Sequence, residues 1–378
     1  MSKRANGEGN IKKRTDGKWE ARITLSGKRR SVYGKTQAEV MKKLKALQKD
    51  HENGIDLEAA NMTVEQWLEI WMREYRNGIK DSTKATYMQD IRLHINPYIG
   101  EIKMSKLTPV IVQRLYNQAV ARGLSPKSIK NTHGILHKAL VQAVKIGYLD
   151  RNVCDSCELP AIRKKEMKPI TDDALPRFLK AIQGDEYGDL MFVALFTGLR
   201  ESEIIGLTWD CIDFERRWIR IYRQLSKERI KGGGGKYVFT DLKNKKERSF
   251  TAIPAVFDTL MRVKRRQYEW RLRSGAEWSN PNNLVFTNEC GRNLATTTVW
   301  KHFKKIAQSI GVGDSRFHDL RHTFATLSIE AGNDIKTISE SLGHATTAFT
   351  MDVYSHVSEK MQRDNAQRMQ EHLQAIIQ

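Results

Sequence analysis

Arginine, histidine and tyrosine residues gather in four short stretches in the second half of this sequence. The stretches are Phe196 to Ile204, Phe317 to Thr326, Ser341 to His344 and Met351 to His356. Arginine offers a planar, permanently charged fork that fits phosphate oxygens, and two such forks can neutralise the charge that develops at phosphorus. A tyrosine hydroxyl becomes a nucleophile when guanidinium groups favour the phenolate and a histidine accepts its proton. The set therefore predicts attack of a tyrosine on a phosphate ester without a metal ion.

The elements that would carry these residues can be read from their spacing. His318 and Arg321 are three residues apart, so the start of a helix would place them on one side. Leu320, Phe324, Leu327 and Ala331 form the expected buried stripe of that helix, and Gly332 ends it. Arg321 then lies at the edge of the stripe, near the core and able to reach a ligand.

A second helix is predicted to follow directly. Asn333 or Asp334 would cap it, Gly343 would end it, and His344 comes just beyond that turn. Thr346 or Thr347 would begin a further short helix carrying Tyr354. Helix ends thus supply the arginine, histidine and tyrosine side chains to one region.

These stretches resemble the tyrosine recombinase family, which includes the integrases of phages and conjugative transposons. The pattern Thr-Gly-Leu-Arg-x-x-Glu fits Thr197 to Glu203, and His-x-x-Arg-His fits His318 to His322. Leu-Gly-His fits Leu342 to His344, and Tyr354 lies ten residues after that histidine. The resemblance covers residues 169–357 directly, and its motifs are specific because four occur in order.

The resemblance implies a role for each matching residue. Arg200 and Arg321 would clamp the scissile phosphate, and His344 would donate a further hydrogen bond to it. His318 would assist proton transfer at Tyr354, which would attack the phosphorus and form a 3′-phosphotyrosyl link. These five residues are the predicted catalytic set.

Two further positions follow from the same resemblance. A family lysine in a β-hairpin protonates the leaving 5′-oxygen, and Lys243 is the best match, with Lys245 and Lys246 as alternatives. Glu203 would support the first arginine. The resemblance implies no cofactor and no metal ion, and Cys154 with Cys157 forms only a single pair of zinc-type spacing.

Composition favours a DNA partner. The chain has 378 residues, a formal net charge of +20 and a pI near 9.7, which points to an anionic partner. The most apolar run, Leu190 to Leu199, is too short to cross a bilayer, so no membrane association is expected. Four cysteines imply no disulfide framework, and the bacterial cytoplasm, at the nucleoid, is the expected location.

Residues 1–56 are predicted to form a small α+β module that binds arm-type DNA sites. The segment has 15 Lys and Arg against 7 Asp and Glu. Three short strands are expected at residues 11–13, 19–25 and 30–33, followed by a helix over 36–53 with Thr36 and Glu39 as a capping pair. The basic residues expected to contact DNA are Arg14, Lys18, Arg22 and Arg30.

Residues 62–160 are predicted to form an all-helical core-binding domain. Helices should begin at Thr63, Ser82, Thr108 and Ser125, and Asn96-Pro97 should stop the second of them. Trp67, Ile70, Trp71 and Tyr75 would form the buried stripe of the first helix. The DNA contacts expected at helix starts are Lys84, Lys127 and Lys130. Residues 152–168 look like an interdomain linker.

Residues 169–378 are predicted to form a mixed α+β catalytic domain, so the chain is multidomain and mainly α. Strands are expected at residues 218–222, 237–242, 249–253 and 284–287, and the glycine run 232–235 suggests a hairpin tip. The tail after Ser358 has helical spacing, and in the family such a tail docks on a neighbouring subunit.

Recombination of two duplexes needs four tyrosines, so the resemblance implies a homotetramer on double-stranded DNA. A host DNA-bending protein and a directionality factor are further expected partners. Two other functions stay open at this level: a topoisomerase-like enzyme that uses the same chemistry on one duplex, and a DNA-binding regulator with an idle site. The separate amino-terminal module favours the recombinase over the first, and the intact catalytic positions favour it over the second.

Overall fold

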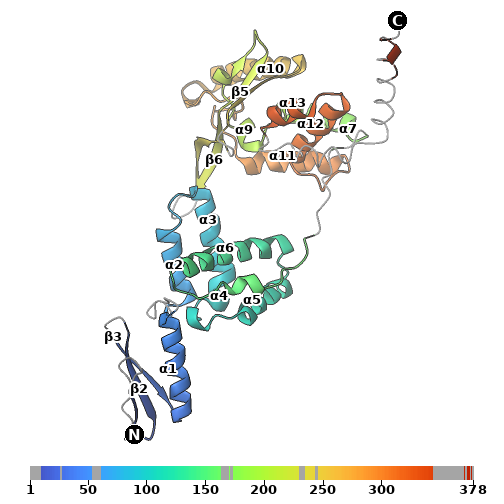
Figure 1. Cartoon of the computed structure of the whole chain (residues 1–378). Helices are drawn as coiled ribbons and strands as arrows, with labels where there is room; N and C mark the ends of the chain where they lie inside the picture. The colour runs from blue at the N-terminus through green and yellow to red at the C-terminus, as the bar shows by residue number, and fades with distance from the viewer. Residues whose placement is uncertain are drawn as a thin grey trace. The chain divides into compact units, whose positions relative to one another are not determined.

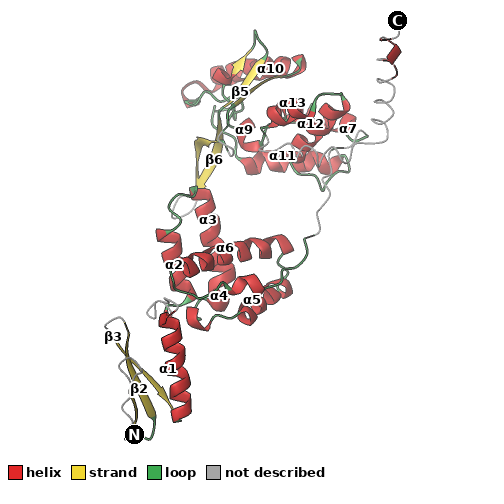
Figure 2. Cartoon of the chain, viewed as in Figure 1, coloured by secondary structure: helices red, strands yellow, loops and turns green. Residues whose placement is uncertain are grey.

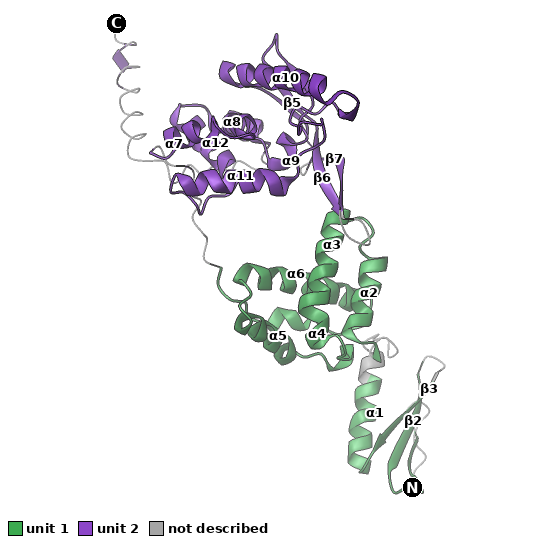
Figure 3. Cartoon of the chain, turned by 180° about the vertical axis from the view of Figure 1, so that it is seen from behind, with its two compact units in different colours: residues 1–164 green, residues 165–378 purple. Residues whose placement is uncertain are grey.

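The computed structural model describes residues 10–25, 28–52, 61–162, 170, 173–229, 235–242, 246–343, 370, 373, 374 and 376. The chain divides into two compact units, residues 1–164 and residues 165–378 (Figure 3). Among the described residues, no helix has the length and apolar character that a bilayer crossing requires.

The first unit begins with a three-stranded antiparallel sheet and one helix (Figure 1). Its elements are β1 Asn10–Lys13, β2 Trp19–Leu25, β3 Lys28–Gly34 and α1 Gln37–Glu52. The side chain of Thr36 accepts the Glu39 amide, and Glu39 accepts the Lys35 amide, which gives the predicted capping interaction. Val40 and Leu44 of α1 are buried with residues of β2, so the predicted sheet-and-helix module is confirmed.

Helices build the remainder of the first unit. They are α2 Val64–Glu74, α3 Asp81–Asp90, the π-helical η2 Ile91–Ile95, α4 Asn96–Ile99, the 3-10 helix η3 Met104–Lys106, α5 Pro109–Ala121, α6 Pro126–Lys145 and the 3-10 helix η4 Val153–Ser156. Trp67 and Trp71 are buried as predicted, and the Trp67 indole donates to the Ala139 carbonyl at 3.0 Å. Tyr75, however, is exposed, because α2 ends at Glu74 and Tyr75 is only its C-cap.

The expectation that Asn96-Pro97 stops a helix is wrong. The chain passes from α3 through the π-helical η2 directly into α4, in which Pro97 lies in the first turn. Proline cannot donate a backbone hydrogen bond and its ring crowds the carbonyl four residues earlier. The wider π turn, in which the Asn96 amide donates to the Ile91 carbonyl, accommodates that ring.

The predicted linker also begins too early. Asn152 and Cys154 are buried, and η4 packs with Val153 in the same core as Trp67. The Asn152 side chain accepts the Cys154 amide at 3.0 Å and donates to the His137 carbonyl at 3.2 Å. This polar side chain therefore fixes the turn to α6, and the segment belongs to the helical core.

The second unit combines helices with two small antiparallel sheets (Figure 2). Its helices are α7 Leu175–Ile182, α8 Gly188–Thr197, α9 Glu201–Ile204, the 3-10 turns η5 Trp209–Cys211 and η6 Gly275–Glu277, α10 Pro254–Ser274, α11 Thr296–Ser309, α12 Asp319–Glu330 and α13 Ile335–Leu342. Its strands are β4 Ile212–Asp213, β5 Trp218–Ile221, β6 Arg223–Arg229, β7 Gly235–Asp241 and β8 Arg248–Thr251. The predicted mixed α+β class is thus confirmed.

The strands of the two sheets follow one another closely in sequence. Ile221 of β5 pairs with Arg248 of β8, and Arg223 of β6 pairs with Asp241 of β7. Only Tyr222 separates β5 from β6 in sequence, whereas residues 242–247 separate β7 from β8. The predicted glycine tip joins β6 to β7 and lies mostly outside the described residues. Strand β6 was not predicted, because its polar residues lack an apolar alternation.

The strand predicted at residues 284–287 is wrong. Leu284 and Thr287 each make one isolated bridge, with Thr208 and Asn293 respectively. The buried Gln267 amide donates to the Leu284 and Val285 carbonyls at 3.0 and 2.8 Å. A side chain thus takes the acceptors that a neighbouring strand would otherwise use.

Helix α12 faces the core with a different stripe from the one predicted. Leu320 is buried, but Phe324 and Leu327 are only partly buried and Ala331 is exposed. Polar and small side chains take the inward positions instead: they include Arg321, His322, Thr323, Ala325 and Ser328. An apolar pattern alone could not show this, since the helix turns a polar face inward.

Candidate active site

Arg200 is positioned by a sharp turn between two helices. Helix α8 ends at Gly198, whose φ of 62° lies in the left-handed region, and Arg200 then caps α9 in extended conformation. A Cβ atom at Gly198 would lie 2.5 Å from Leu342 and 2.6 Å from Phe324. Only glycine fits both the turn and this close approach, which brings the Arg200 segment against α12 and α13.

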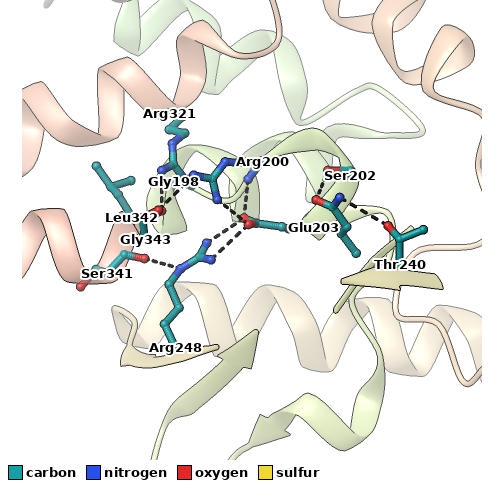
Figure 4. Close-up of polar contacts among 11 residues, drawn as sticks. Gly198, Arg200, Ser202, Glu203, Thr240, Arg248, Arg321, Ser341, Leu342 and Gly343 are labelled. Carbon is teal, nitrogen blue, oxygen red and sulfur yellow. Dashed lines mark hydrogen bonds and ion pairs between the residues drawn. The ribbon is translucent and has the colours of Figure 1, made fainter. Parts of the chain in front are cut away.

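The Glu203 carboxylate holds Arg200 (Figure 4). Its Oε2 atom accepts the Arg200 backbone amide at 2.9 Å, and its Oε1 atom accepts Arg200 Nη1 at 2.7 Å. Arg248, at the start of β8, donates from Nη1 and Nη2 to the same two oxygens at 3.1 and 2.7 Å. One carboxylate therefore binds two guanidinium groups, in agreement with the predicted support of the first arginine.

Arg321 lies beside this group and is 2% exposed. Its Nη1 atom donates to the Gly198 carbonyl at 2.7 Å, and its Nη2 atom donates to the Leu342 carbonyl. It is more deeply placed than the predicted position at the edge of an apolar stripe.

Three arginines share the carboxyl end of α13. Arg248 Nε donates to the Ser341 carbonyl at 2.7 Å, Arg321 to the Leu342 carbonyl, and Arg200 Nη2 to the Gly343 carbonyl at 3.1 Å. The last carbonyls of a helix have no partner inside the helix and carry its negative dipole end. Guanidinium groups from three distant segments satisfy them here.

The site carries an excess of positive charge. Three guanidinium groups surround one fully buried carboxylate, which leaves a net charge of +2. The arginine neighbours lower the pKa of Glu203 to about 2 despite its burial, so it is ionised at neutral pH. Burial, together with the nearby Arg200, lowers the pKa of Arg321, but the guanidinium stays protonated at neutral pH. Such an excess favours an anionic ligand.

His318 lies next to the arginines as the N-cap of α12. Although part of His318 is exposed, burial of the rest, together with the neighbouring His322 and Arg321, lowers its pKa to about 4. Its ring contacts His322 edge-on, with centroids 5.1 Å apart. His318 is therefore neutral at physiological pH and has a ring nitrogen able to accept a proton.

The remaining catalytic candidates lie outside the described residues. These are Lys243, Lys245, His344 and Tyr354. Lys246 is described and is exposed. The three lysines lie between β7 and β8 in sequence, and these two strands belong to different sheets.

Arg248 was missed from the sequence. It precedes Phe250 on the inward side of β8, where the burial alternates between exposed and covered residues. An arginine on the inward face of a strand next to an apolar residue was the signal that could have identified it, because buried charges occur where a partner compensates them.

The basic residues predicted in the amino-terminal module fall on different faces. Arg22 pairs with Ser31, on the face of the sheet opposite the buried Ala21 and Ile23, and its Nε donates to Glu20 at 2.8 Å. Arg30 pairs with Ile23 and so points to the helix-covered side. Arg14 is exposed beside the β1–β2 turn, with its guanidinium over the Tyr33 ring, and Lys18 is exposed at the same turn.

Two of the three lysines predicted in the helical domain line one groove. Lys127 and Lys130 of α6 lie there with Lys138, facing α3 residues that include Asp90. The groove encloses about 580 Å³. Lys84 of α3 is half-buried and is not part of the groove lining.

Comparisons with known proteins agree with this arrangement. Residues 168–361 match the phage integrase family, and residues 63–119 match the phage integrase N-terminal SAM-like domain. A protein of Caldanaerobacter subterraneus described as "Tyrosine recombinase XerC-like" is 31% identical over 353 residues, covering 89% of this chain and 90% of the relative. The ICEBs1 integrase of Bacillus subtilis is 27% identical and covers 78% of this chain and 80% of its own length.

Solved structures share the fold. The Tn1549 transposon integrase in complex with transposon right end DNA superposes with a TM-score of 0.68 at 24% identity, covering 81% of this chain and 99% of that one. A lambda integrase tetramer bound to a Holliday junction gives a TM-score of 0.59 at 18% identity, covering 93% and 96%. The chain belongs to the phage integrase family. Within it, the chain is a tyrosine-type site-specific recombinase.

Proposed function

We propose that this recombinase integrates and excises a mobile genetic element, of a phage or a conjugative transposon, with Tyr354 as the nucleophile. The main support for the proposed site is the hydrogen-bonding capacity that Arg200 and Arg321 have left for a ligand. Within the described residues, each guanidinium spends two of its five N–H groups on protein oxygens. Three donors on each, in a site of net positive charge, suit the non-bridging oxygens of a phosphodiester.

The proposed step is a direct displacement at phosphorus. The Tyr354 oxygen attacks the scissile phosphorus, its proton passes to neutral His318, and a P–O bond forms to tyrosine. The bond to the 5′-oxygen breaks, and that oxygen takes a proton from Lys243, with Lys245 and Lys246 as alternatives. Arg200, Arg321 and His344 stabilise the charge on the non-bridging oxygens. A 5′-hydroxyl of a second strand reverses the step, so the phosphodiester energy is conserved.

The other regions receive DNA-binding roles in this proposal. Residues 1–56 would bind arm-type sites and residues 62–160 the core site, with residues 169–378 as the catalytic domain. The groove lysines Lys127 and Lys130, and the open sheet face with Arg22, support such contacts. Arg14 and Lys18 extend that surface at the turn, whereas Arg30 and Lys84 are less favourably placed.

The partners follow from the reaction. Exchange of strands between two duplexes needs four tyrosines, so we propose a homotetramer on DNA. Complexes of structural relatives, one on transposon end DNA and one a tetramer on a Holliday junction, support this assembly. A host DNA-bending protein and a directionality factor complete the proposed set, and the enzyme would act in the bacterial cytoplasm, at the nucleoid.

A nicked suicide duplex built from the ends of the encoding element tests the proposal. Cleavage beside the nick releases a short strand and traps the covalent link. We expect wild type to give a denaturation-resistant protein–DNA adduct and Tyr354→Phe to give none while binding the duplex equally well. An adduct with the Tyr354→Phe variant, or none with wild type despite binding, would refute the assignment. Relaxation of plasmid without any joining of two cognate sites would point to a topoisomerase instead.

A further inference from the structure

We propose that Arg248 is a positioning residue for strand cleavage, which acts on the phosphate through Glu203 and Arg200. The inference rests on the proposed function. It adds to the catalytic machinery one residue, Arg248, that none of the sequence motifs contains. Arg248 lies on β8, 45 residues from Glu203 and 93 from Ser341 in sequence, and contacts both.

Each of the three guanidinium nitrogens of Arg248 donates a hydrogen bond to a protein oxygen (Figure 4). Both terminal nitrogens bind the Glu203 oxygens in a bidentate pair, and Nε binds the Ser341 carbonyl at 2.7 Å. The side chain is 8% exposed. All three guanidinium nitrogens bind protein oxygens, so we infer that Arg248 acts on the phosphate through these partners.

The first partner is the carboxylate that also holds Arg200. Each Glu203 oxygen accepts one hydrogen bond from Arg200 and one from Arg248. Without Arg248, the carboxylate would direct its full charge at Arg200 and would be free to rotate toward it. Arg248 therefore fixes the plane of the carboxylate and, through it, the direction of the Arg200 fork.

Charge gives Arg248 a second effect on the same step. The cluster has a net charge of +2 with Arg248 and would have +1 without it. A phosphodiester carries one negative charge, and its pentacoordinate transition state carries about two. The cluster thus matches the transition state better than the ground state, which is the condition for raising a rate rather than an affinity.

The second partner links this strand to the segment that leads into His344. Arg248 binds the Ser341 carbonyl, and a Cβ atom at Gly343 would lie 3.1 Å from both Cδ and Nη1 of Arg248. The left-handed turn at Gly343, with φ of 64°, is therefore packed directly on the arginine. The same side chain thus fixes Arg200 on one side and the end of α13 on the other.

Single-turnover cleavage of the suicide duplex by the full-length enzyme tests the inference. We expect Arg248→Met to lower the cleavage rate constant by about 100-fold, with the dissociation constant for DNA changed by less than about 3-fold. Arg248→Lys keeps the charge but loses the fork, and we expect a loss of about 10-fold. The matched control is Arg220→Met, which removes an ion pair of the same 2.7 Å length to Glu247 on the exposed side of the same sheet. That variant should stay within about 3-fold of wild type.

A second substrate separates an effect on the phosphate from general damage to the fold. A methylphosphonate at the scissile position removes one negative charge, so the ratio of wild type to Arg248→Met should shrink from about 100 to below about 10. An equal ratio on both substrates would overturn the inference, as would wild-type cleavage by a folded Arg248→Met variant. If Arg248→Met does not fold, a folded Arg248→Lys variant with wild-type rate overturns it. Failure of wild type to form an adduct refutes the proposed function itself.

Discussion

Replacing Glu203 with Gln removes the negative charge that two guanidinium groups share. The resulting loss in the free energy of unfolding can be worked out in two ways. The arginines lower the pKa of Glu203 from 4.5 to about 2. At 1.36 kcal/mol for each unit, this shift corresponds to about 3 kcal/mol of stability at neutral pH. Removal of one partner of a buried ion pair independently costs about 3–5 kcal/mol. We therefore expect Glu203→Gln to lower the free energy of unfolding of the catalytic unit by about 3 kcal/mol.

The pH dependence has a definite sign. A carboxyl group whose pKa is lower in the folded state stabilises the fold fully above its unfolded pKa, here 4.5. That contribution disappears as the pH falls toward about 2. The difference between wild type and Glu203→Gln should thus be constant from pH 6 to 8 and fall to about half near pH 3.

Amide hydrogen exchange of peptides from α8 and α12, in the full chain, reports the stability of this unit alone. Glu201→Gln is the matched control, since Glu201 lies two residues away and burial raises its pKa instead. Loss of that charge should leave stability unchanged or increase it slightly at pH 7. Equal destabilisation by both variants, or a loss below about 1 kcal/mol for Glu203→Gln, would refute the reasoning.

Three further predictions concern the core and the site. Gly198→Ala should lower the free energy of unfolding by about 1–3 kcal/mol, because its Cβ would lie 2.5 Å from Leu342 and 2.6 Å from Phe324; an unchanged thermal midpoint would contradict this. His318→Gln should reduce the loss of stability between pH 6.5 and about 4, because burial lowers the pKa of His318 to about 4 and the unfolded chain binds the proton first. Urea titrations at pH 7 and pH 5 measure this, and an identical pH dependence would oppose it. Trp67→Phe should lower the free energy of unfolding by about 1–3 kcal/mol, because the Ala139 carbonyl loses the indole donor and keeps only its hydrogen bond within α6. Faster amide exchange in α6 would show this, and wild-type protection there would argue against a contribution from the indole hydrogen bond.

Local signals predicted the helices well where a side chain caps the backbone. Thr63, Thr108, Ser125 and Asp334 each accept an amide of the first turn, and each helix begins where the sequence indicated. Capping depends on residues three positions apart, so a short window contains the whole interaction. The motif residues Arg200, Glu203, His318 and Arg321 could be proposed as site residues for a similar reason, because each motif is contiguous.

Features that depend on distant partners were not predictable in this way. Pro97 looks like a helix stop, and only the π turn before it allows the helix to continue. Arg248 stands outside every motif, and its partners lie 45 and 93 residues away. The inward polar face of α12 could not be predicted from apolar periodicity, because that pattern indicates only which side chains are buried among apolar groups. Arg321 is buried against carbonyl oxygens instead.

The three arginine contacts at the end of α13 depend on residues that come late in the sequence of this unit. The contacts join residues separated by 143, 93 and 21 positions, from Arg200 to Gly343, Arg248 to Ser341 and Arg321 to Leu342. A chain that is still being synthesised, or one cut before Ser341, holds the first arginines but lacks the carbonyls that aim them. Loss of these last residues therefore leaves all three guanidinium groups without the helix end that orients them.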